Sequence, residues 1–325
     1  MSNSSRRSFL KSAAAAPLAA AFAPSIASSL PAAPPGRAAL LDTAGQPSGA
    51  PAYSGGTPKK SMLISLVQPK ELPIADKFKV ARDAGFVAME MHTVEDQAEA
   101  EAAKKASEET GVKIHSVMNG AHWRFPLSSG DPEVVNKSVA GMETSLKNAV
   151  LWGAGAVLLV PAVVDAKTSY QDAWKRSQQV IRERLLPKYQ EQKVIIAVEE
   201  VWNKFLLSPL EMARYVDEFK SDWVKAYMDV GNVVFYGFPQ DWIRTLGKRI
   251  VRMHLKDFKL DRGAGRFEWK NLGEGDIDWV DVRKAMTEIG YDGYMTIEIA
   301  GGDATYLKDV SARIDRFLSG QKPVT

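Results

Sequence analysis

Val194-Ile-Ile-Ala-Val-Glu199 is the first of four short apolar segments that each end in a carboxylate or imidazole side chain. The others are Val224-Lys-Ala-Tyr-Met-Asp229, Ile250-Val-Arg-Met-His254 and Tyr294-Met-Thr-Ile-Glu298. Their β-branched and aromatic residues are typical of buried strands. Longer stretches with helical spacing separate them, and strands that alternate with helices indicate parallel βαβ units.

The same alternation runs through most of the chain. Four further strands are predicted upstream, at Met62–Val67, Phe86–Met91, Lys113–Val117 and Ala156–Val160. Helices are predicted at about 73–84, 95–110, 133–152, 169–191, 208–220, 239–248, 278–289 and 305–319. Eight such units within residues 61–318, a span of 258 residues, match the roughly 250 residues of an α/β (β/α)₈ TIM barrel. A doubly wound sheet is the alternative, but no Gly-x-Gly-x-x-Gly follows the first strand.

Local residues predict where helices begin and end. Ser208-Pro209 and Asp278-Trp279 have the N-cap residues that accept hydrogen bonds from the free amides of a first turn. Glycines precede several predicted strands, and we expect them to end the preceding helices, at Gly85, Gly111, Gly155 and Gly293.

The N-terminal 60 residues differ from the rest in composition. Ser5-Arg6-Arg7-Ser8-Phe9-Leu10-Lys11 precedes a short Ala-rich apolar run, a pattern typical of a cleavable twin-arginine signal peptide. We assign residues 1–27 to this signal, 28–60 to an Ala/Pro/Gly-rich disordered linker and 61–325 to a single barrel domain. The prediction is periplasmic location, or other export by the twin-arginine machinery, without a stable membrane anchor. The alternative is a disordered tail with an accidental arginine pair.

Charge and composition exclude several functions. The chain contains no cysteine, which rules out disulfides, thiolate metal ligands and a cysteine nucleophile. The formal net charge is +3, but the first 27 residues hold three basic and no acidic residues, so the remainder is neutral. We therefore expect no nucleic-acid partner. The composition is compatible with a homo-oligomer.

The strand ends predict a metal site. Active sites of TIM barrels lie at the carboxyl ends of the strands, where Glu199, Asp229, His254 and Glu298 would converge. Three neighbouring carboxylates are costly without a compensating cation, so we expect one divalent metal ion. Oxygen-rich ligands favour Mn²⁺, with Mg²⁺, Co²⁺ or Zn²⁺ as alternatives.

Four motifs resemble the xylose isomerase-like TIM barrel superfamily, especially its sugar phosphate isomerases and epimerases. They are Glu199-Glu200-Val-Trp-Asn-Lys-Phe205, Asp229-Val-Gly-Asn232, His254-Leu-Lys-Asp257 and Gly273-Glu-Gly-Asp276, followed by Thr296-Ile-Glu298. The resemblance covers about 61–318. It implies that Glu199, Asp229, His254 and Glu298 bind the metal and that Glu199 and Glu298 are the catalytic acid/base pair. Strand alternation favours Glu199 over Glu200 as the ligand.

Other residues near strand ends are candidates for substrate binding. Glu90 follows the second strand, His115 lies on the third, and His122-Trp123 lies in the loop beyond it. Lys256, two residues after His254, would face the same side and bind a sugar oxygen, or else pair with Asp257. The alternatives to substrate binding are that Trp123 is a packed aromatic residue and that the histidines face solvent.

These features predict an isomerase or epimerase that acts through an enediolate on an unphosphorylated sugar or keto-sugar, since phosphorylated sugars are kept in the cytoplasm. A lyase or hydratase of 3-keto-glycosides is the alternative. A phosphate could lie on Gly301-Gly302, but a tight turn needs these glycines equally. Endonuclease IV-like DNA repair is disfavoured because the chain has only four histidines. A sugar-binding protein without catalysis is the last alternative.

Overall fold

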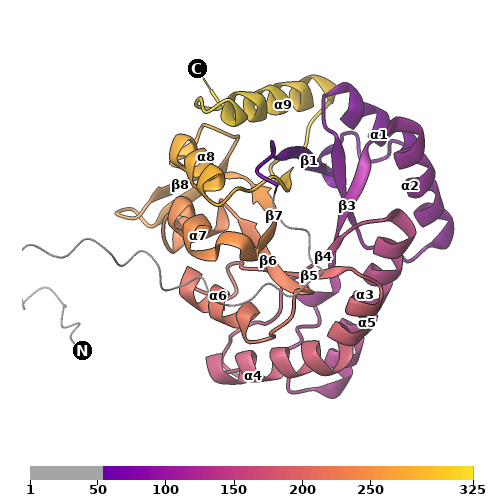
Figure 1. The fold of residues 1–325 in the computed structure, drawn as a ribbon, viewed down its shortest axis with the longest axis vertical. Helices are drawn as coiled ribbons and strands as arrows, with labels where there is room; N and C mark the ends of the chain where they lie inside the picture. The colour runs from indigo at the N-terminus through magenta and orange to yellow at the C-terminus, as the bar shows by residue number, and fades with distance from the viewer. Residues whose placement is uncertain (1–53, 325) are drawn as a thin grey trace, which may run out of the picture. The chain divides into compact units, whose positions relative to one another are not determined.

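The computed structural model describes residues 54–324, and the predicted signal and most of the predicted linker lie outside them. Eight parallel strands close into a barrel in the order β1-β10-β7-β6-β5-β4-β3-β2 (Figure 1). The strands are β1 (Lys59–Leu63), β2 (Ala88–His92), β3 (Lys113–Met118), β4 (Ala156–Leu159), β5 (Ile195–Glu199), β6 (Val224–Asp229), β7 (Ile250–Leu255) and β10 (Tyr294–Ile297). The predicted TIM barrel is confirmed.

Helices surround the strands as an outer ring (Figure 1). They are α1 (Ile74–Asp83), α2 (Gln97–Thr110), α3 (Pro132–Trp152), α4 (Tyr170–Val180), α5 (Leu186–Glu191), α6 (Pro209–Asp217), α7 (Pro239–Leu246), α8 (Trp279–Glu288) and α9 (Ala304–Leu318). The predicted helix 169–191 is divided into α4 and α5 by a π-helical turn at Ile181–Leu185. None of the helices within residues 54–324 combines the length and apolarity needed to cross a membrane.

Capping explains most helix ends. The hydroxyl of Ser208 accepts from the Glu211 amide, and the carboxylate of Asp278 accepts from two amides of α8, as predicted. Gly111 ends α2 in a left-handed conformation, also as predicted. The predictions for Gly155 and Gly293 are wrong.

The left-handed glycines near those two strands lie earlier in the chain. Gly153 caps α3 with φ 68° and Gly290 follows α8 with φ 73°. These caps lie two and three residues before Gly155 and Gly293, and a short connection leads from each cap to the next strand. β1 likewise begins at Lys59, and a 3₁₀ turn at Ile64–Leu66 replaces the predicted end of this strand.

Alternation along each strand separates an apolar outer face from a mixed inner face. Outward residues such as Ile196, Val198 and Met253 pack beneath the helices in the main hydrophobic core. Inward apolar residues from β4 to β6 fill one side of the barrel interior, among them Leu158 and Ala197. Other inward positions carry buried polar groups, among them Glu90, His115, His254 and Thr296. The barrel interior is thus polar beneath one part of its mouth.

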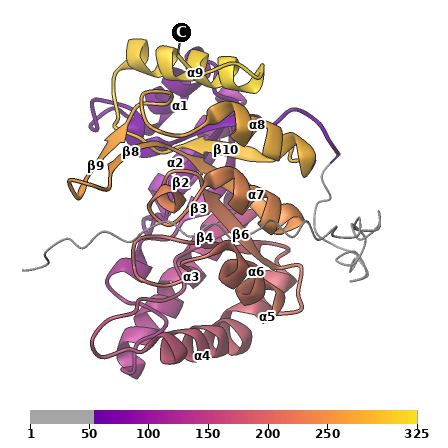
Figure 2. The same ribbon diagram turned by 90° about the vertical axis from the view of Figure 1, so that its left-hand side faces the viewer.

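An antiparallel hairpin follows β7 and was not predicted. It consists of β8 (Asp257–Asp261) and β9 (Arg266–Lys270) and projects from the barrel (Figure 2). Asp257 anchors its base: the buried carboxylate accepts from the amides of Phe258 and Gly273 and from the indole of Trp279, each at 2.8 Å. The hairpin therefore forms a wall beside the carboxyl end of β7.

Candidate metal centre

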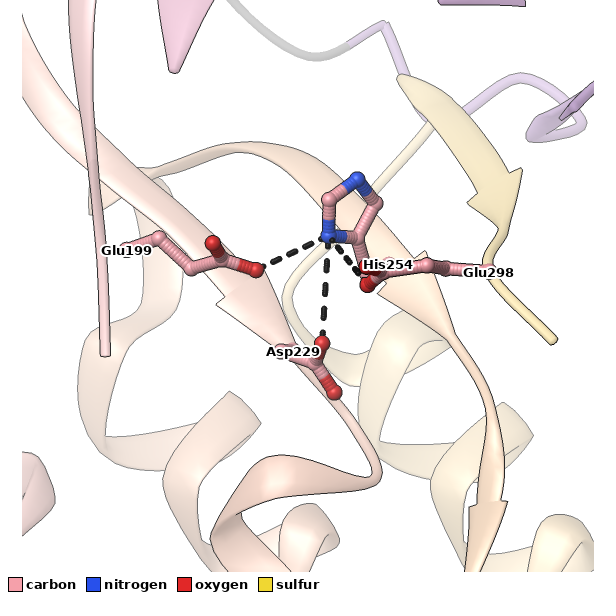
Figure 3. Close-up of side chains that lie close together, drawn as sticks. All are labelled: Glu199, Asp229, His254 and Glu298. Carbon is pink, nitrogen blue, oxygen red and sulfur yellow. Dashed lines mark hydrogen bonds and ion pairs between the residues drawn. The ribbon is translucent and has the colours of Figure 1, made fainter. Parts of the chain in front are cut away.

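Four side chains that could hold a metal ion lie close together at the carboxyl ends of the strands (Figure 3). Glu199 and Asp229 are the last residues of β5 and β6, His254 lies near the end of β7, and Glu298 directly follows β10. Parallel register brings them level, because Asp229 pairs with His254 and the Glu298 amide donates to the Leu255 carbonyl. One ligand atom from each of the four side chains lies within 4.8 Å of all the others.

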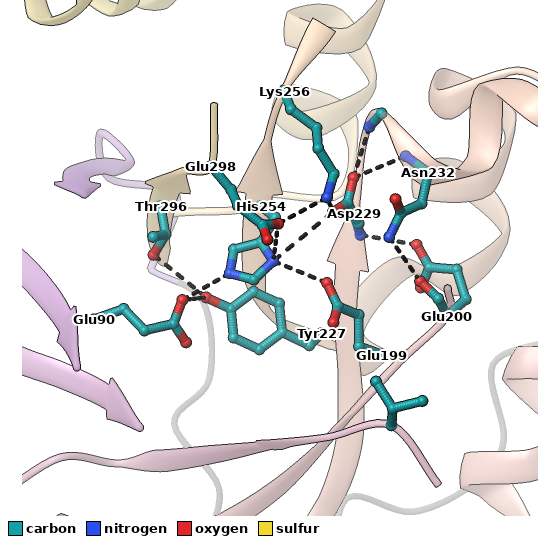
Figure 4. A network of polar contacts seen from close by, with 12 residues as sticks. Glu90, Glu199, Glu200, Tyr227, Asp229, Asn232, His254, Lys256, Thr296 and Glu298 are labelled. Carbon is teal, nitrogen blue, oxygen red and sulfur yellow. Dashed lines mark hydrogen bonds and ion pairs between the residues drawn. The ribbon is translucent and has the colours of Figure 1, made fainter. Parts of the chain in front are cut away.

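His254 is the centre of this group. Its Nδ1 atom lies 2.8 Å from a Glu199 oxygen, 3.1 Å from a Glu298 oxygen and 3.8 Å from Asp229 Oδ2. Its Nε2 atom lies 2.6 Å from Glu90 Oε2, on the opposite side of the ring (Figure 4). Glu90 therefore fixes the ring so that Nδ1 points toward the three carboxylates.

Asp229 is also held in a fixed orientation. Its Oδ1 atom accepts from the amides of Gly231 and Asn232, both at 2.8 Å, so Oδ2 is turned toward the cluster. Glu200 accepts from the Asp229 amide at 2.9 Å and lies behind the site. The structure thus brings Glu199 into the cluster and leaves Glu200 as a support for the Asp229 backbone.

Lys256 reaches the cluster from above. Its ammonium lies 2.8 Å from both Asp229 Oδ2 and Glu298 Oε2, and it does not pair with Asp257. A glycine is required at 231, because a Cβ atom there would clash with the Lys256 side chain and lie 2.9 Å from its carbonyl oxygen. The ammonium also lies 5.0 Å from the ring centre of Trp269 in the hairpin.

The electrostatics of the cluster depend on two positive groups. Burial raises the pKa of Glu199 to about 7, against the opposing attraction of His254. Burial also acts on Glu298, but His254 and Lys256 outweigh it and lower the pKa of Glu298 below its usual range. Burial raises the pKa of Asp229 despite the nearby ammonium of Lys256. The site therefore favours additional positive charge.

These residues fit a divalent cation. The side chains of Asp229 and His254 are fully buried, that of Glu199 is almost so, and that of Glu298 is 29% exposed toward the mouth. Three carboxylate oxygens and one imidazole nitrogen form the hard, oxygen-rich set that Mn²⁺ or Mg²⁺ binds, and Zn²⁺ and Co²⁺ also accept it. A cation among these atoms would compete with the ammonium of Lys256 for Asp229 and Glu298.

A hollow of about 230 Å³ opens above the cluster and is called the inner hollow here. Glu199, Glu298 and Lys256 line its floor, and the side chains of Trp123, Trp202 and Trp269 are prominent among the others that line it. Lys256 and Trp123 are thus placed where the sequence predicted substrate contacts. Polar groups at the floor and tryptophans beside them suit a sugar, whose ring has polar edges and apolar faces.

His122 also lines the inner hollow, and its hydrogen bonds fix its tautomer. Its Nδ1 atom accepts from the Val160 amide at 3.4 Å and faces the Asn119 amide nitrogen at 3.3 Å; Asn119 Oδ1 is turned to the Ala121 amide. The neutral ring therefore carries its hydrogen on Nε2. This buried atom has no partner among the described residues, and burial lowers the pKa of His122 to about 3.

Two predicted substrate contacts lie deeper in the barrel. Glu90 is fully buried beneath His254, and its position makes it a support for the cluster. His115 is 3% exposed, bonds to Thr296 at 3.0 Å and stacks on Tyr294 with ring centres 4.4 Å apart. Neither lines the inner hollow as described, so both belong to the packed layer below it.

Sequence reasoning missed the polar layer that supports the cluster. The hydroxyl of Tyr227 donates to Glu90 at 3.1 Å and lies 3.3 Å from Thr296 (Figure 4). Tyr227 and Thr296 each precede a cluster residue by two positions, and this spacing places them on the same inward face. It also missed Trp269, because the hairpin that carries it was not predicted.

Comparisons with known proteins agree with this architecture. The chain is 28% identical over 246 residues to SgbU of Escherichia coli (strain K12), provisionally named as an L-ribulose-5-phosphate 3-epimerase; the match covers 71% of this chain and 85% of SgbU. A D-allulose 3-epimerase from Methylomonas sp., solved with D-allulose, has a TM-score of 0.64 and 16% identity over 78% of this chain and 86% of its own. The 3-keto-D-glucoside 4-epimerase YcjR from E. coli has a TM-score of 0.66 and 15% identity over 79% and 99%.

The two solved structures share the fold of this chain. Its sequence relatives carry the names of sugar epimerases. A model of the xylose isomerase-like TIM barrel family matches residues 78–316, which is most of the chain. The protein belongs to the xylose isomerase-like TIM barrel family.

Proposed function

We propose that this protein is a divalent-metal-dependent epimerase or isomerase of an unphosphorylated sugar or keto-sugar. Glu199, Asp229, His254 and Glu298 would hold the cation, with Mn²⁺ favoured. The convergence of their ligand atoms within 4.8 Å, beside the inner hollow, carries this proposal. The epimerase activities named for its homologues support it.

The proposed chemistry is proton transfer at carbon. The cation, when bound, polarises a sugar carbonyl and the adjoining hydroxyl oxygen and so acidifies the C–H bond between them. Glu199 at the end of β5 and Glu298 after β10 lie on opposite sides of the neighbouring strands β6 and β7. These two glutamates are the proposed acid/base pair. Return of the proton to the same carbon gives an epimer, and return to the adjacent carbon gives an aldose–ketose isomer.

The inner hollow offers two donors for sugar oxygens. The Nε2–H of His122 has no protein partner among the described residues, and a substrate carbonyl or hydroxyl would accept from it. Lys256 can donate to the substrate once a cation takes its place between Asp229 and Glu298. Trp123 would stack on a ring face.

Two features favour an unphosphorylated substrate. Lys256 is the only lysine or arginine lining the inner hollow in the part of the chain that the structure describes, and two carboxylates already hold it. The amide of Gly302 donates to the Leu66 carbonyl at 2.9 Å, so this glycine pair serves a close approach of backbones more than a phosphate. The substrate in the name of SgbU is phosphorylated, whereas the substrates in the names of YcjR and the allulose enzyme are not.

The proposed location agrees with that substrate. Residues 1–27 have the twin-arginine pattern, and the chain would then work in the periplasm, where sugar phosphates are not retained. Twin-arginine export moves folded proteins, so the cation would be loaded before export.

Deuterium exchange tests the proposed reaction. Candidate ketoses and keto-sugars are incubated in D₂O with the full chain and Mn²⁺, and C–H loss is followed by NMR. We expect exchange at the carbon beside the carbonyl, abolished in Glu298→Gln and retained in Glu288→Gln, whose side chain is on the surface with Arg244. Failure of every candidate to exchange would show that enolisation is not its chemistry.

Product mass separates the remaining functions. Epimerisation and isomerisation conserve the mass of the substrate, whereas a 3-keto-glycoside lyase or hydratase changes it and releases a group. A protein that binds sugar without catalysis would bind the same sugars in Glu298→Gln and in wild type and would exchange no proton in either.

A further inference from the structure

A second and larger hollow adjoins the inner hollow. It has a volume of about 550 Å³ and is called the outer hollow here. The segments after β3 and β4 line it together with Arg176 of α4, and Trp123 lines both hollows. The inner hollow is smaller than most sites for drug-sized ligands, which occupy roughly 300–1,000 Å³, and its size suits one sugar ring. The outer hollow therefore provides space for a group attached to that ring.

Trp123 is presented rigidly between the two hollows. Its side chain is 59% exposed, an unusual state for such a large aromatic residue. Trp123 belongs to the 3₁₀ turn Ala121–Trp123, which packs closely against α3. Only glycine fits at position 141 of α3, because a Cβ atom there would clash with Ala121. Its ring also makes an edge contact with His122, with ring centres 4.9 Å apart. An exposed tryptophan on a fixed turn is suited to stacking against a sugar ring.

The charges of the outer hollow balance. Its charged side chains are Asp131, Asp165, Lys167 and Arg176, two of each sign. Arg176 is already engaged by Asp172 at 3.6 Å and by the Ser128 carbonyl at 3.4 Å. Donors and acceptors without an excess of positive charge suit the hydroxyl groups of a neutral ligand better than a phosphate.

We propose that the outer hollow binds the second sugar ring of a disaccharide whose reacting ring lies in the inner hollow, with Trp123 stacked at the junction. The inference rests on the proposed function, because the reacting ring is placed by the metal centre. It makes the natural substrate a glycoside in place of a free monosaccharide.

Exchange rates with matched substrates test the inference. The full chain with Mn²⁺ is given a 3-keto-hexose as its methyl glycoside and as a disaccharide, and the kcat/KM for C–H exchange is measured. Stacking and added hydrogen bonds predict a preference of about tenfold or more for the disaccharide. Gly130→Trp should lower that preference several-fold, because the new side chain fills the outer hollow from a position where a Cβ has only ordinary contacts.

Two variants check the interpretation. Trp123→Ala should also lower the preference for the disaccharide. Phe238→Ala removes another exposed aromatic, 71% exposed, that lines neither hollow, and it should leave the preference unchanged. Circular dichroism confirms that each variant is folded before its rates are compared.

Each outcome has a distinct meaning. Equal rates for the two glycosides, with no effect of Gly130→Trp, would overturn the outer subsite and leave the proposed function standing. A preference for a phosphorylated sugar that is lost in Lys167→Ala would overturn it in favour of a phosphate site. Absence of exchange with every substrate would overturn both the proposed function and this inference.

Discussion

The two ring nitrogens of His254 have different partners. Nδ1 faces the three carboxylates of the cluster, and Nε2 is bound to Glu90 in the buried layer beneath. Histidine ligands of metals commonly use a carboxylate in this way to fix the ring and its tautomer. The cluster residues could be predicted from the sequence because each ends an apolar strand. The supporting role of Glu90 could not, since it depends on which strand lies across the closed barrel.

Glu90→Gln should weaken metal binding although Glu90 is not a proposed ligand. A neutral amide lacks the negative charge by which the Glu90 carboxylate makes the imidazole of His254 a more basic ligand. We therefore expect the affinity for Mn²⁺ to fall by about 10- to 100-fold. Titration with Mn²⁺, followed by electron paramagnetic resonance, measures this loss. Glu109→Gln, an exposed change on α2, is the control. Unchanged affinity in Glu90→Gln would show that His254 needs no such support.

His122→Asn should slow C–H exchange without altering its dependence on pH. The Nε2–H donor is lost at a cost of roughly 1 kcal/mol or more, which is about fivefold or more in kcat/KM. Burial holds the pKa of His122 near 3, so the ring stays neutral from pH 5 to 9 and contributes no titration step in wild type. A pH–rate profile whose shape changes in the variant would contradict a purely neutral donor.

At the scale of elements, periodicity predicted the barrel closely. All eight barrel strands lie where alternating or continuous apolar runs occur, and the run that precedes Glu298, Tyr294–Ile297, forms β10. The differences are at ends and irregularities: the π-helical turn inside 169–191 and the left-handed caps at Gly153 and Gly290. These depend on single backbone angles, which residue patterns constrain only weakly.

The hairpin of β8 and β9 was not predicted, for a different reason. β9, Arg266–Lys270, has four exposed residues of five, and its aromatic side chains pack on neighbours outside the barrel. No buried face produces an apolar run there, so the pattern resembles a loop. Trp269 stacks on Trp202 with ring centres 5.1 Å apart, which shows that tertiary contact stabilises the hairpin.

Asp257→Ala should destabilise the fold, because three donors, from Phe258, Gly273 and Trp279, would lose their acceptor. The buried amides and indole predict a loss of about 2–4 kcal/mol in the free energy of unfolding. Urea denaturation measures it. Asp261→Ala, at the exposed end of the same strand, should cost much less, since its ion pair with Arg266 is on the surface. Equal losses would contradict the anchoring role of Asp257.

At the scale of the whole molecule, the basic residues of the N-terminal segment and the barrel occupy different parts of the chain. The net charge of +3 resides in residues 1–27, and the described barrel begins its first strand at Lys59. The predicted boundary between linker and barrel, at residues 60 and 61, lies inside β1. The predicted signal lies among residues 1–53, outside the described part, and remains a prediction.

Export gives that prediction a direct test. Replacement of both Arg6 and Arg7 by Lys keeps the charge and removes the arginine pair on which the twin-arginine route depends. We expect the variant to stay in the cytoplasmic fraction while wild type reaches the periplasm, as followed by immunoblot of fractionated cells. Equal periplasmic amounts would exclude this route.

The stoichiometry of metal binding tests whether Glu199, Asp229, His254 and Glu298 form one cation site. Mn²⁺ is titrated into the metal-free full chain, and bound ion is counted by electron paramagnetic resonance for wild type, Asp229→Asn and the surface variant Asp261→Asn. Because four residues share one site, we expect one Mn²⁺ per chain in wild type and Asp261→Asn and no saturable binding at the same concentration in Asp229→Asn. The same stoichiometry and affinity in all three proteins would contradict it.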